Sequence, residues 1–256
     1  MPRSNWTREE LILAFNLYCK IPFGTIHNRN PHVIALARLL GRSTSAVSWK
    51  LANLARLDPS LQARNIAGAT HGSELDAEVW KEFSGSWERL AFESERLLAR
   101  RMRRPVEQVA DIDLEGLPKA GKEREAMVRQ RVNQAFFRRM VLSAYNWRCC
   151  VTQLALPELL VASHISPWSK DETNRVNPRN GLCLNALHDR AFDAGLMTIT
   201  PDLRVQLSPA LHRSVRHPAI KGMLVRFEGR RIRLPERFLP DPELIRYHNR
   251  HVFRSH

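Results

Sequence analysis

Two neighbouring stretches of the chain decide its fold: residues 160–168 read LVASHISPW, and residues 177–193 read NPRNGLCLNALHDRAFD. The first is a short apolar run that ends at His164 and is broken by a proline and a tryptophan, which is typical of a strand followed by a loop. The second opens with a polar loop, in which Asn180-Gly181 is a turn signal. The chain is therefore expected to leave one short strand, turn and enter another.

The rest of the second stretch predicts that strand and a helix after it. Leu182 to Leu184 is a short apolar run, and Asn185 to Phe192 begins a helix. Together the two stretches predict a β-hairpin that clasps the start of a helix and presents His164, Asn180 and His188 toward one spot. A neutral imidazole there can act as a base, and a second histidine can act as a metal ligand.

The charge of the chain indicates a polyanionic partner. Its net charge is +14 and its pI is about 10.6, which favours nucleic acid first and an anionic membrane second. Residues 1–60 carry 8 Lys and Arg against 3 Asp and Glu, residues 131–256 carry 20 against 10, and residues 61–130 carry 12 against 13. The excess lies in two separate modules joined by a neutral middle, whereas charge that serves solubility alone would be spread more evenly.

Other compositional features narrow the class of protein. No stretch approaches the roughly 20 apolar residues of a membrane span, and the first residues lack the apolar core of a signal peptide, so we expect a cytoplasmic protein with no membrane partner. The four cysteines include no C-x-x-C pair, which argues against a zinc ribbon.

The N-terminal module reads as three helices. Thr7 and Glu10 form a capping box before an apolar face, and Asn30-Pro31 predicts a second start, with a cap and a proline at the first helical position. Gly41 ends that second helix, and residues 46–57 form a third. Residues 36–51 resemble a helix-turn-helix, in which four polar side chains of the third helix would face a DNA groove: Ser45, Ser48, Lys50 and Asn53. A Myb-like three-helix variant with Trp6 in its core, or a plain bundle without DNA contact, stays open.

The middle of the chain is predicted to be a helical connector. Residues 75–83 and 87–102 have helical periodicity, residues 111–122 read as a loose linker, and residues 123–146 predict a further helix that leads into the C-terminal module.

The segment around His164 resembles the HNH (ββα-metal) endonuclease family, in particular its bacterial restriction-like branch. Members of that branch carry a similar series of A-S-H-I-x-P-W, N-x-x-N-G-L-x-L and H-x-x-x-F-D. The likeness extends upstream to residues 133–138 and downstream to residues 195–199, and covers about 80 residues well.

The resemblance implies a role for each motif residue. His164 matches the base that activates water for attack on phosphorus, and Asn180 matches the asparagine that holds the hairpin and orients that base. His188 matches a metal ligand at the start of the helix. The implied cofactor is one divalent ion, Mg²⁺ or Mn²⁺ before Zn²⁺ or Ni²⁺, which would stabilise the phosphate and the leaving oxygen.

One position departs from the family pattern. Many HNH enzymes place Asp or His immediately before the base as a second metal ligand, where this chain has Ser163, and a hydroxyl is a poor ligand for Mg²⁺. The ion would then rely on His188, waters and DNA phosphate, or would use Asp193 or Asp189. Asp193 is the favoured addition, although it lies five residues from His188, an awkward offset on a helix.

Further residues are candidates for DNA binding. Arg190 either grips a phosphate or balances Asp189, and Gln134 and Arg138 either reach DNA or pin their helix to the hairpin. Beyond the motif we expect extra β-hairpins at residues 196–207 and 223–234. The second would carry a basic ridge suited to phosphates, or a solvated arginine face, made of Arg226, Arg230, Arg231 and Arg233.

The sequence as a whole predicts an α+β protein with three parts: a helix-turn-helix-like module at 1–60, a helical connector at 61–130 and an HNH nuclease domain at 131–256. The predicted function is metal-dependent hydrolysis of phosphodiester bonds in DNA, duplex DNA above all, in restriction or another genome defence. Two alternatives stay open, a DNA-binding regulator on a catalytically silent HNH scaffold and an RNA nuclease. A homodimer also stays open, since no interface is evident in the sequence.

Overall fold

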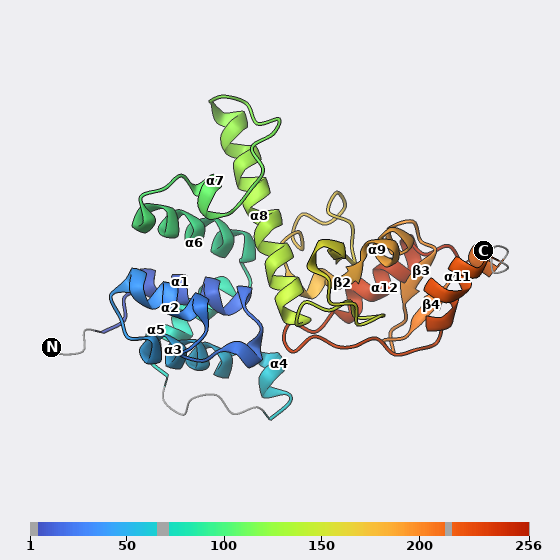
Figure 1. The fold of residues 1–256 in the computed structure, drawn as a ribbon, viewed down its shortest axis with the longest axis horizontal. Coiled ribbons are helices and arrows are strands. Elements are labelled where there is room, and N and C mark those ends of the chain that lie inside the picture. The colour runs from blue at the N-terminus through green and yellow to red at the C-terminus, as the bar shows by residue number, and fades with distance from the viewer. Residues whose placement is uncertain (1–4, 66–71, 213–216, 256) are drawn as a thin grey trace. The chain divides into compact units, whose positions relative to one another are not determined.

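The computed structural model describes residues 5–65, 72–212 and 217–255, which divide into two compact units, Met1–Ser143 and Ala144–His256 (Figure 1). Along the chain, the boundary between these units follows residue 143. The division into three parts, with boundaries at residues 60 and 130, remains a prediction. The first unit is helical, and the second combines two small hairpins with helices, so the predicted α+β class is confirmed.

The helices of the first unit begin and end largely where the sequence signals lie. Their bounds are α1 Arg8–Lys20, α2 Pro31–Leu40, α3 Thr44–Arg56, α4 Pro59–Gln62, α5 Glu74–Phe83, α6 Trp87–Met102, α7 Val106–Val109 and α8 Lys122–Ala144. The predicted capping box at Thr7 and Glu10 is present, and Asn30 caps α2 with Pro31 following. Gly41 ends α2 with a φ of 65°, a left-handed conformation that glycine adopts without a Cβ penalty.

Helix α1 is the centre of the first unit. It is buried almost all round and contacts α2, α3, α5 and α6. Phe15 on α1 stacks on Trp80, with ring centroids 4.8 Å apart, and the Tyr18 hydroxyl donates to Asp58 at 2.8 Å. These contacts hold α3 and α5 against the same apolar helix, which fixes the surface that α3 shows to solvent.

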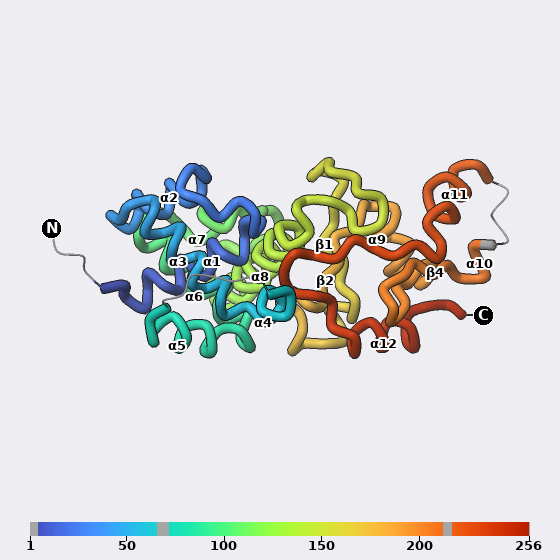
Figure 2. The backbone as a smooth tube through the Cα atoms, turned by 90° about the horizontal axis from the view of Figure 1, so that it is seen from below, coloured from blue at the N-terminus to red at the C-terminus, as the bar shows by residue number. Residues whose placement is uncertain are grey.

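The second unit is built around the predicted hairpin and helix. Its elements are β1 Leu160–His164, β2 Gly181–Asn185, α9 Ala186–Asp193, β3 Met197–Ile199, β4 Val205–Leu207, α10 Pro209–His212, α11 Pro218–Met223 and α12 Pro242–His251. Strands β1 and β2 pair antiparallel, as do β3 and β4. Helix α9 packs on β1, β2 and β3, and α12 packs on β3 (Figure 2).

The end of α9 is fixed by a close approach. Gly195 has a φ of 68°, and a Cβ at this position would lie 2.1 Å from the carbonyl oxygen of Val252. Only glycine fits there, so the chain turns from α9 into β3 directly against the end of α12.

One predicted hairpin is confirmed and the other is wrong. Strands β3 and β4 form the hairpin expected within residues 196–207. Residues 223–234 form no hairpin; they contain the end of α11, a 3₁₀ turn at Val225–Phe227 and one isolated bridge between Arg231 and Arg204. The buried apolar residues of this stretch explain the difference. Leu224 and Phe227 lie three positions apart, so a helical turn buries both on one side.

Candidate active site

The hairpin places His164 at the end of strand β1. His164 pairs with Gly181 and Ser163 pairs with Leu182 across the two strands. The ladder continues for one more bond, from the Ile165 amide to the Asn180 carbonyl at 2.9 Å, before the chain leaves as a loop. The imidazole is thus carried at the point where a rigid strand meets an irregular segment.

The His164 ring is held in one tautomer. Its Nε2 lies 2.9 Å from the carbonyl oxygen of Arg175, and because a carbonyl can only accept, Nε2 carries the proton. The Trp168 ring meets the imidazole edge-on, with centroids 5.5 Å apart. Burial lowers the pKa of His164 more than the Arg175 carbonyl raises it. The ring is therefore neutral at neutral pH, with its basic lone pair on Nδ1.

Asn180 ties together the loop that holds the histidine. Its side chain is fully buried; Oδ1 accepts from the Ser166 amide at 2.7 Å, and Nδ2 donates to the carbonyls of Ser166 and Asn174 at 3.1 Å each. Asn174 directly precedes Arg175, so these bonds locate the carbonyl that fixes the His164 tautomer.

His188 is turned into the core and not toward His164, and its role as a metal ligand stays a prediction. The residue is 1% exposed, its Nε2 lies 2.8 Å from the Met223 carbonyl, and its Nδ1 lies 3.3 Å from Nδ2 of Asn185. Phe227 contacts the ring edge-on. Both ring nitrogens therefore have neighbours inside the protein at the start of α9.

A buried cysteine completes the surroundings of His188. The Cys149 sulfur lies 3.9 Å from Nδ1 of His188. Burial raises the pKa of the Cys149 thiol, but hydrogen bonds with His188 and Thr152 lower it, to about 7. This group lies on the side of α9 away from solvent, with Cys149 itself wholly buried.

The residue after His188 points the other way, toward Ser163. Burial raises the pKa of Asp189, and the Ser163 hydroxyl and the Arg190 charge lower it in part. Burial also raises the pKa of Asp193, and the charge of Asp189 raises it further. Positions 189 and 193 are one helical turn apart. The two carboxylates of α9 are therefore neighbours, and Asp189 lies against the Ser163 hydroxyl of β1.

These carboxylates suit a hard cation. Ser163 is 2% exposed, and its Oγ makes no well-formed hydrogen bond in the described part of the chain. Carboxylates are oxygen donors of the kind that Mg²⁺ and Mn²⁺ prefer, and a cation would relieve the repulsion between Asp189 and Asp193. Among the described residues no group of three His, Cys, Asp or Glu side chains is placed to hold a metal. Waters and substrate oxygens would have to complete the coordination.

The basic residues predicted near the site lie on the surface. Arg190 is exposed on α9, and Gln134 and Arg138 are exposed on α8, in the first unit. All four arginines of the predicted ridge are exposed; Arg226 lies in the 3₁₀ turn, and the other three follow it along the chain. The guanidinium groups of Arg226 and Arg230 lie 4.9 and 5.8 Å from the Phe227 ring.

The candidates on α3 divide into two groups. Ser45 is exposed and Ser48 and Asn53 are half-buried, as a DNA-facing helix requires. The prediction for Lys50 is corrected, because its Nζ is buried and lies 2.7 and 3.0 Å from the two oxygens of Asp76. Trp49, which was not among the predicted site residues, is 65% exposed on the same helix.

Residues 149–200 match the model of a family described as HNH endonuclease. This stretch contains β1, β2, α9 and β3, and forms an HNH endonuclease domain. HNH nucleases typically use a divalent metal ion. A search of curated proteins finds no matching relative. No helix in the described ranges combines the length and the apolar character that crossing a bilayer requires.

Proposed function

We propose that the HNH endonuclease domain hydrolyses phosphodiester bonds of duplex DNA, with His164 as the general base. The observation that carries this proposal is the neutral imidazole held by the Arg175 carbonyl, one residue from a buried hydroxyl that faces the Asp189 carboxylate. A base, a cation-binding face and a nucleic-acid family match then coincide within a single hairpin and helix.

The reaction needs one proton transfer at His164. Nδ1 takes a proton from the attacking water as the water oxygen bonds to phosphorus, and the bond from phosphorus to the 3′ oxygen breaks. The ring becomes imidazolium, whose second N–H stays on the Arg175 carbonyl at 2.9 Å. Because this hydrogen bond exists before the reaction, the ring does not have to reorient.

The cation would be held by Asp189 and Asp193, with the Ser163 hydroxyl as a weak additional donor. A divalent ion at such a position polarises the phosphate and neutralises charge on the leaving oxygen. Asp189 is partly buried and Asp193 is exposed at the end of α9. Exposure at one end leaves room for the waters and phosphate oxygens that the protein side chains do not replace.

The arginine ridge of the second unit would supply affinity for the DNA backbone. Contacts between arginines and phosphates provide binding that depends on salt and not on sequence. Duplex DNA is preferred over RNA in this proposal because α2, Gly41 and α3 have the layout of a helix-turn-helix. A role in restriction or another genome defence is part of the proposal and rests on the family resemblance alone.

Cleavage of supercoiled plasmid tests the proposal. The full chain should nick plasmid DNA in the presence of Mg²⁺ or Mn²⁺, and His164→Ala should abolish nicking while leaving the circular dichroism spectrum unchanged. His251→Ala, which removes an exposed histidine of α12, is the matched control and should nick normally. Nicking by His164→Ala at the normal rate would remove His164 from its role, and faster cleavage of RNA of matched length would overturn the choice of DNA.

A catalytically silent HNH scaffold is the second candidate function. It is favoured by Ser163 in place of a stronger ligand and by the lack of a three-ligand group in the described ranges. In that case the chain shifts DNA in a gel but cuts nothing with Mg²⁺, Mn²⁺, Ni²⁺ or Zn²⁺.

A further inference from the structure

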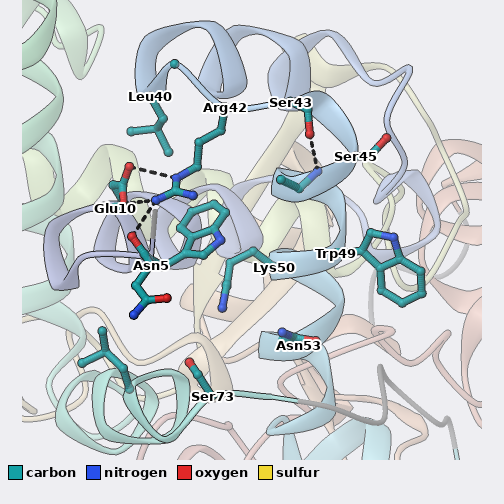
Figure 3. Close-up of a pocket in the computed structure, with 14 residues that line it drawn as sticks. Asn5, Glu10, Leu40, Arg42, Ser43, Ser45, Trp49, Lys50, Asn53 and Ser73 are labelled. Carbon is teal, nitrogen blue, oxygen red and sulfur yellow. Dashed lines mark hydrogen bonds and ion pairs between the residues drawn. The ribbon is translucent and has the colours of Figure 1, made fainter. Parts of the chain in front are cut away.

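The first unit contains a cavity that the nuclease reaction does not use. Its volume is ≈ 1110 Å³, slightly above the range of about 300–1,000 Å³ that is usual for small-molecule sites. The turn between α2 and α3, the outer face of α3 and the starts of α1 and α5 form its walls (Figure 3). This volume is large enough to admit a nucleobase.

The charged groups of the lining already have partners. Arg42 binds both carboxylate oxygens of Glu10, at 2.8 and 2.9 Å, and Lys50 binds both oxygens of Asp76. Both cations also lie over the ring of Trp6, at 4.3 and 5.2 Å from its centroid. A lining whose charges are compensated in this way favours a neutral ligand over a phosphate or a carboxylate.

The remaining polar lining groups are amides and hydroxyls, contributed by Asn5, Ser43, Ser45, Asn53 and Ser73. An amide offers two donors and one acceptor, and the known contact of Asn53, with Asp76 at 3.3 Å, uses one donor. Groups of this kind recognise the edges of heterocyclic bases.

Trp49 stands at the rim of the cavity. At 65% it is the most exposed large hydrophobic side chain in the described part of the chain. It lies one helical turn from Ser45 and one from Asn53, and Figure 3 shows its ring projecting outward while Lys50 and Asn53 point inward. An indole has one N–H donor and two broad π faces, so its usual contact with nucleic acid is stacking on a base that has left its own stack.

We propose that an unstacked DNA base binds at the rim of this cavity, the Trp49 pocket, where it stacks on Trp49 and hydrogen-bonds through its edge to Ser45 and Asn53, one helical turn to either side (Figure 3). This inference rests on the proposed function, because that function identifies DNA as the ligand. It adds that the first unit holds DNA through an extruded base and not only through side chains laid in a groove. Extrusion costs least where the base is already unpaired, so the pocket favours duplexes with a bulged or mismatched base.

Fluorescence anisotropy with labelled duplexes tests the pocket without cleavage. The full chain is titrated, in EDTA, against a fully paired duplex and against the same duplex with one bulged adenine. The bulged duplex is expected to bind about 5- to 150-fold more tightly, the range that stacking of one base on an aromatic ring supplies. Trp49→Leu should reduce this preference to less than about twofold, and Trp49→Phe should retain most of it. The control is Ile34→Ala, which should leave the preference intact. It changes an exposed apolar residue of α2 outside the pocket.

The outcomes separate this proposal from the nuclease proposal. Equal binding of both duplexes, or a preference that survives Trp49→Leu, overturns the pocket while leaving the nuclease untouched. A preference that Trp49→Leu removes supports the pocket even if plasmid is never nicked. Failure to bind either duplex overturns the pocket, while the nuclease proposal is decided by the plasmid assay with Mg²⁺ or Mn²⁺.

Discussion

Replacing Asn180 tests how the loop positions the base. Asn180→Ala removes three hydrogen bonds to buried backbone groups, those to the Ser166 amide and to the Ser166 and Asn174 carbonyls. Each buried group left without a partner costs about 1–3 kcal/mol, and relaxation recovers part of this, so we expect a loss of about 2–4 kcal/mol in the free energy of unfolding of the second unit. Displacement of the Arg175 carbonyl by about 1 Å would also slow nicking by up to about 100-fold.

A second variant and a control separate the amide's role from general damage. Asn180→Asp keeps the acceptor but sets a carboxylate oxygen against two carbonyl oxygens, so it should be at least as destabilising as alanine. Asn177 lies in the same loop, caps the turn at Pro178–Asn180 through the Arg179 amide at 3.0 Å, and is half-buried. Because water can replace its bonds, Asn177→Ala should cost about 1 kcal/mol or less.

The assays are urea unfolding, hydrogen exchange of the peptides covering residues 160–185, and single-turnover nicking. Faster exchange confined to that region, with a lower nicking rate in fully folded protein, is the expected result. An Asn180→Ala chain as stable and as active as the Asn177→Ala control would refute the positioning argument.

Three further outcomes follow from other parts of the structure. Lys50→Ala leaves the fully buried Asp76 carboxylate without its cation, so thermal or urea unfolding of the first unit should show a loss of about 3–5 kcal/mol, and a loss no larger than that of Ser45→Ala would contradict the buried pair. Burial lowers the pKa of His248 to about 4, so as pH falls the unfolded chain binds a proton at this residue before the folded chain does. Between about pH 6.5 and pH 4 the free energy of unfolding of the second unit should therefore fall by about 3 kcal/mol. The His248→Gln chain should not show this loss. Changing an arginine of the ridge that contacts a phosphate to glutamine should reduce the slope of log affinity for DNA against log salt by about 0.9. Arg250→Gln on α12 should leave the slope unchanged. Unchanged slopes in all four ridge variants would show that the ridge binds no DNA.

The elements with strong local signals could be predicted from the sequence. The hairpin and helix around His164 follow from short apolar runs bounded by Pro167 and by Asn180-Gly181, and the capping residue Thr7 marks the start of α1 as the structure has it. These signals act over a few residues, so they can be recognised in the sequence without knowing the tertiary structure.

The orientation of single side chains could not be predicted in the same way. His188 and Asp189 are neighbours, but consecutive positions on a helix point about 100° apart, and the sequence alone does not show which of them faces β1. The more typical metal ligand, His188, is the one turned into the core. Lys50 is similar, since its partner Asp76 lies 26 residues further along the chain.

The placement of the cation beside Asp189, and not at His188, is tested most directly by the metal dependence of plasmid nicking. We predict that Asp189→Asn raises the Mn²⁺ concentration for half-maximal nicking by at least about tenfold. Asp202→Asn, which changes an exposed carboxylate paired with Arg204, should leave it unchanged. An unaltered Mn²⁺ requirement in Asp189→Asn, together with a raised one in a folded His188→Gln chain, would contradict the account.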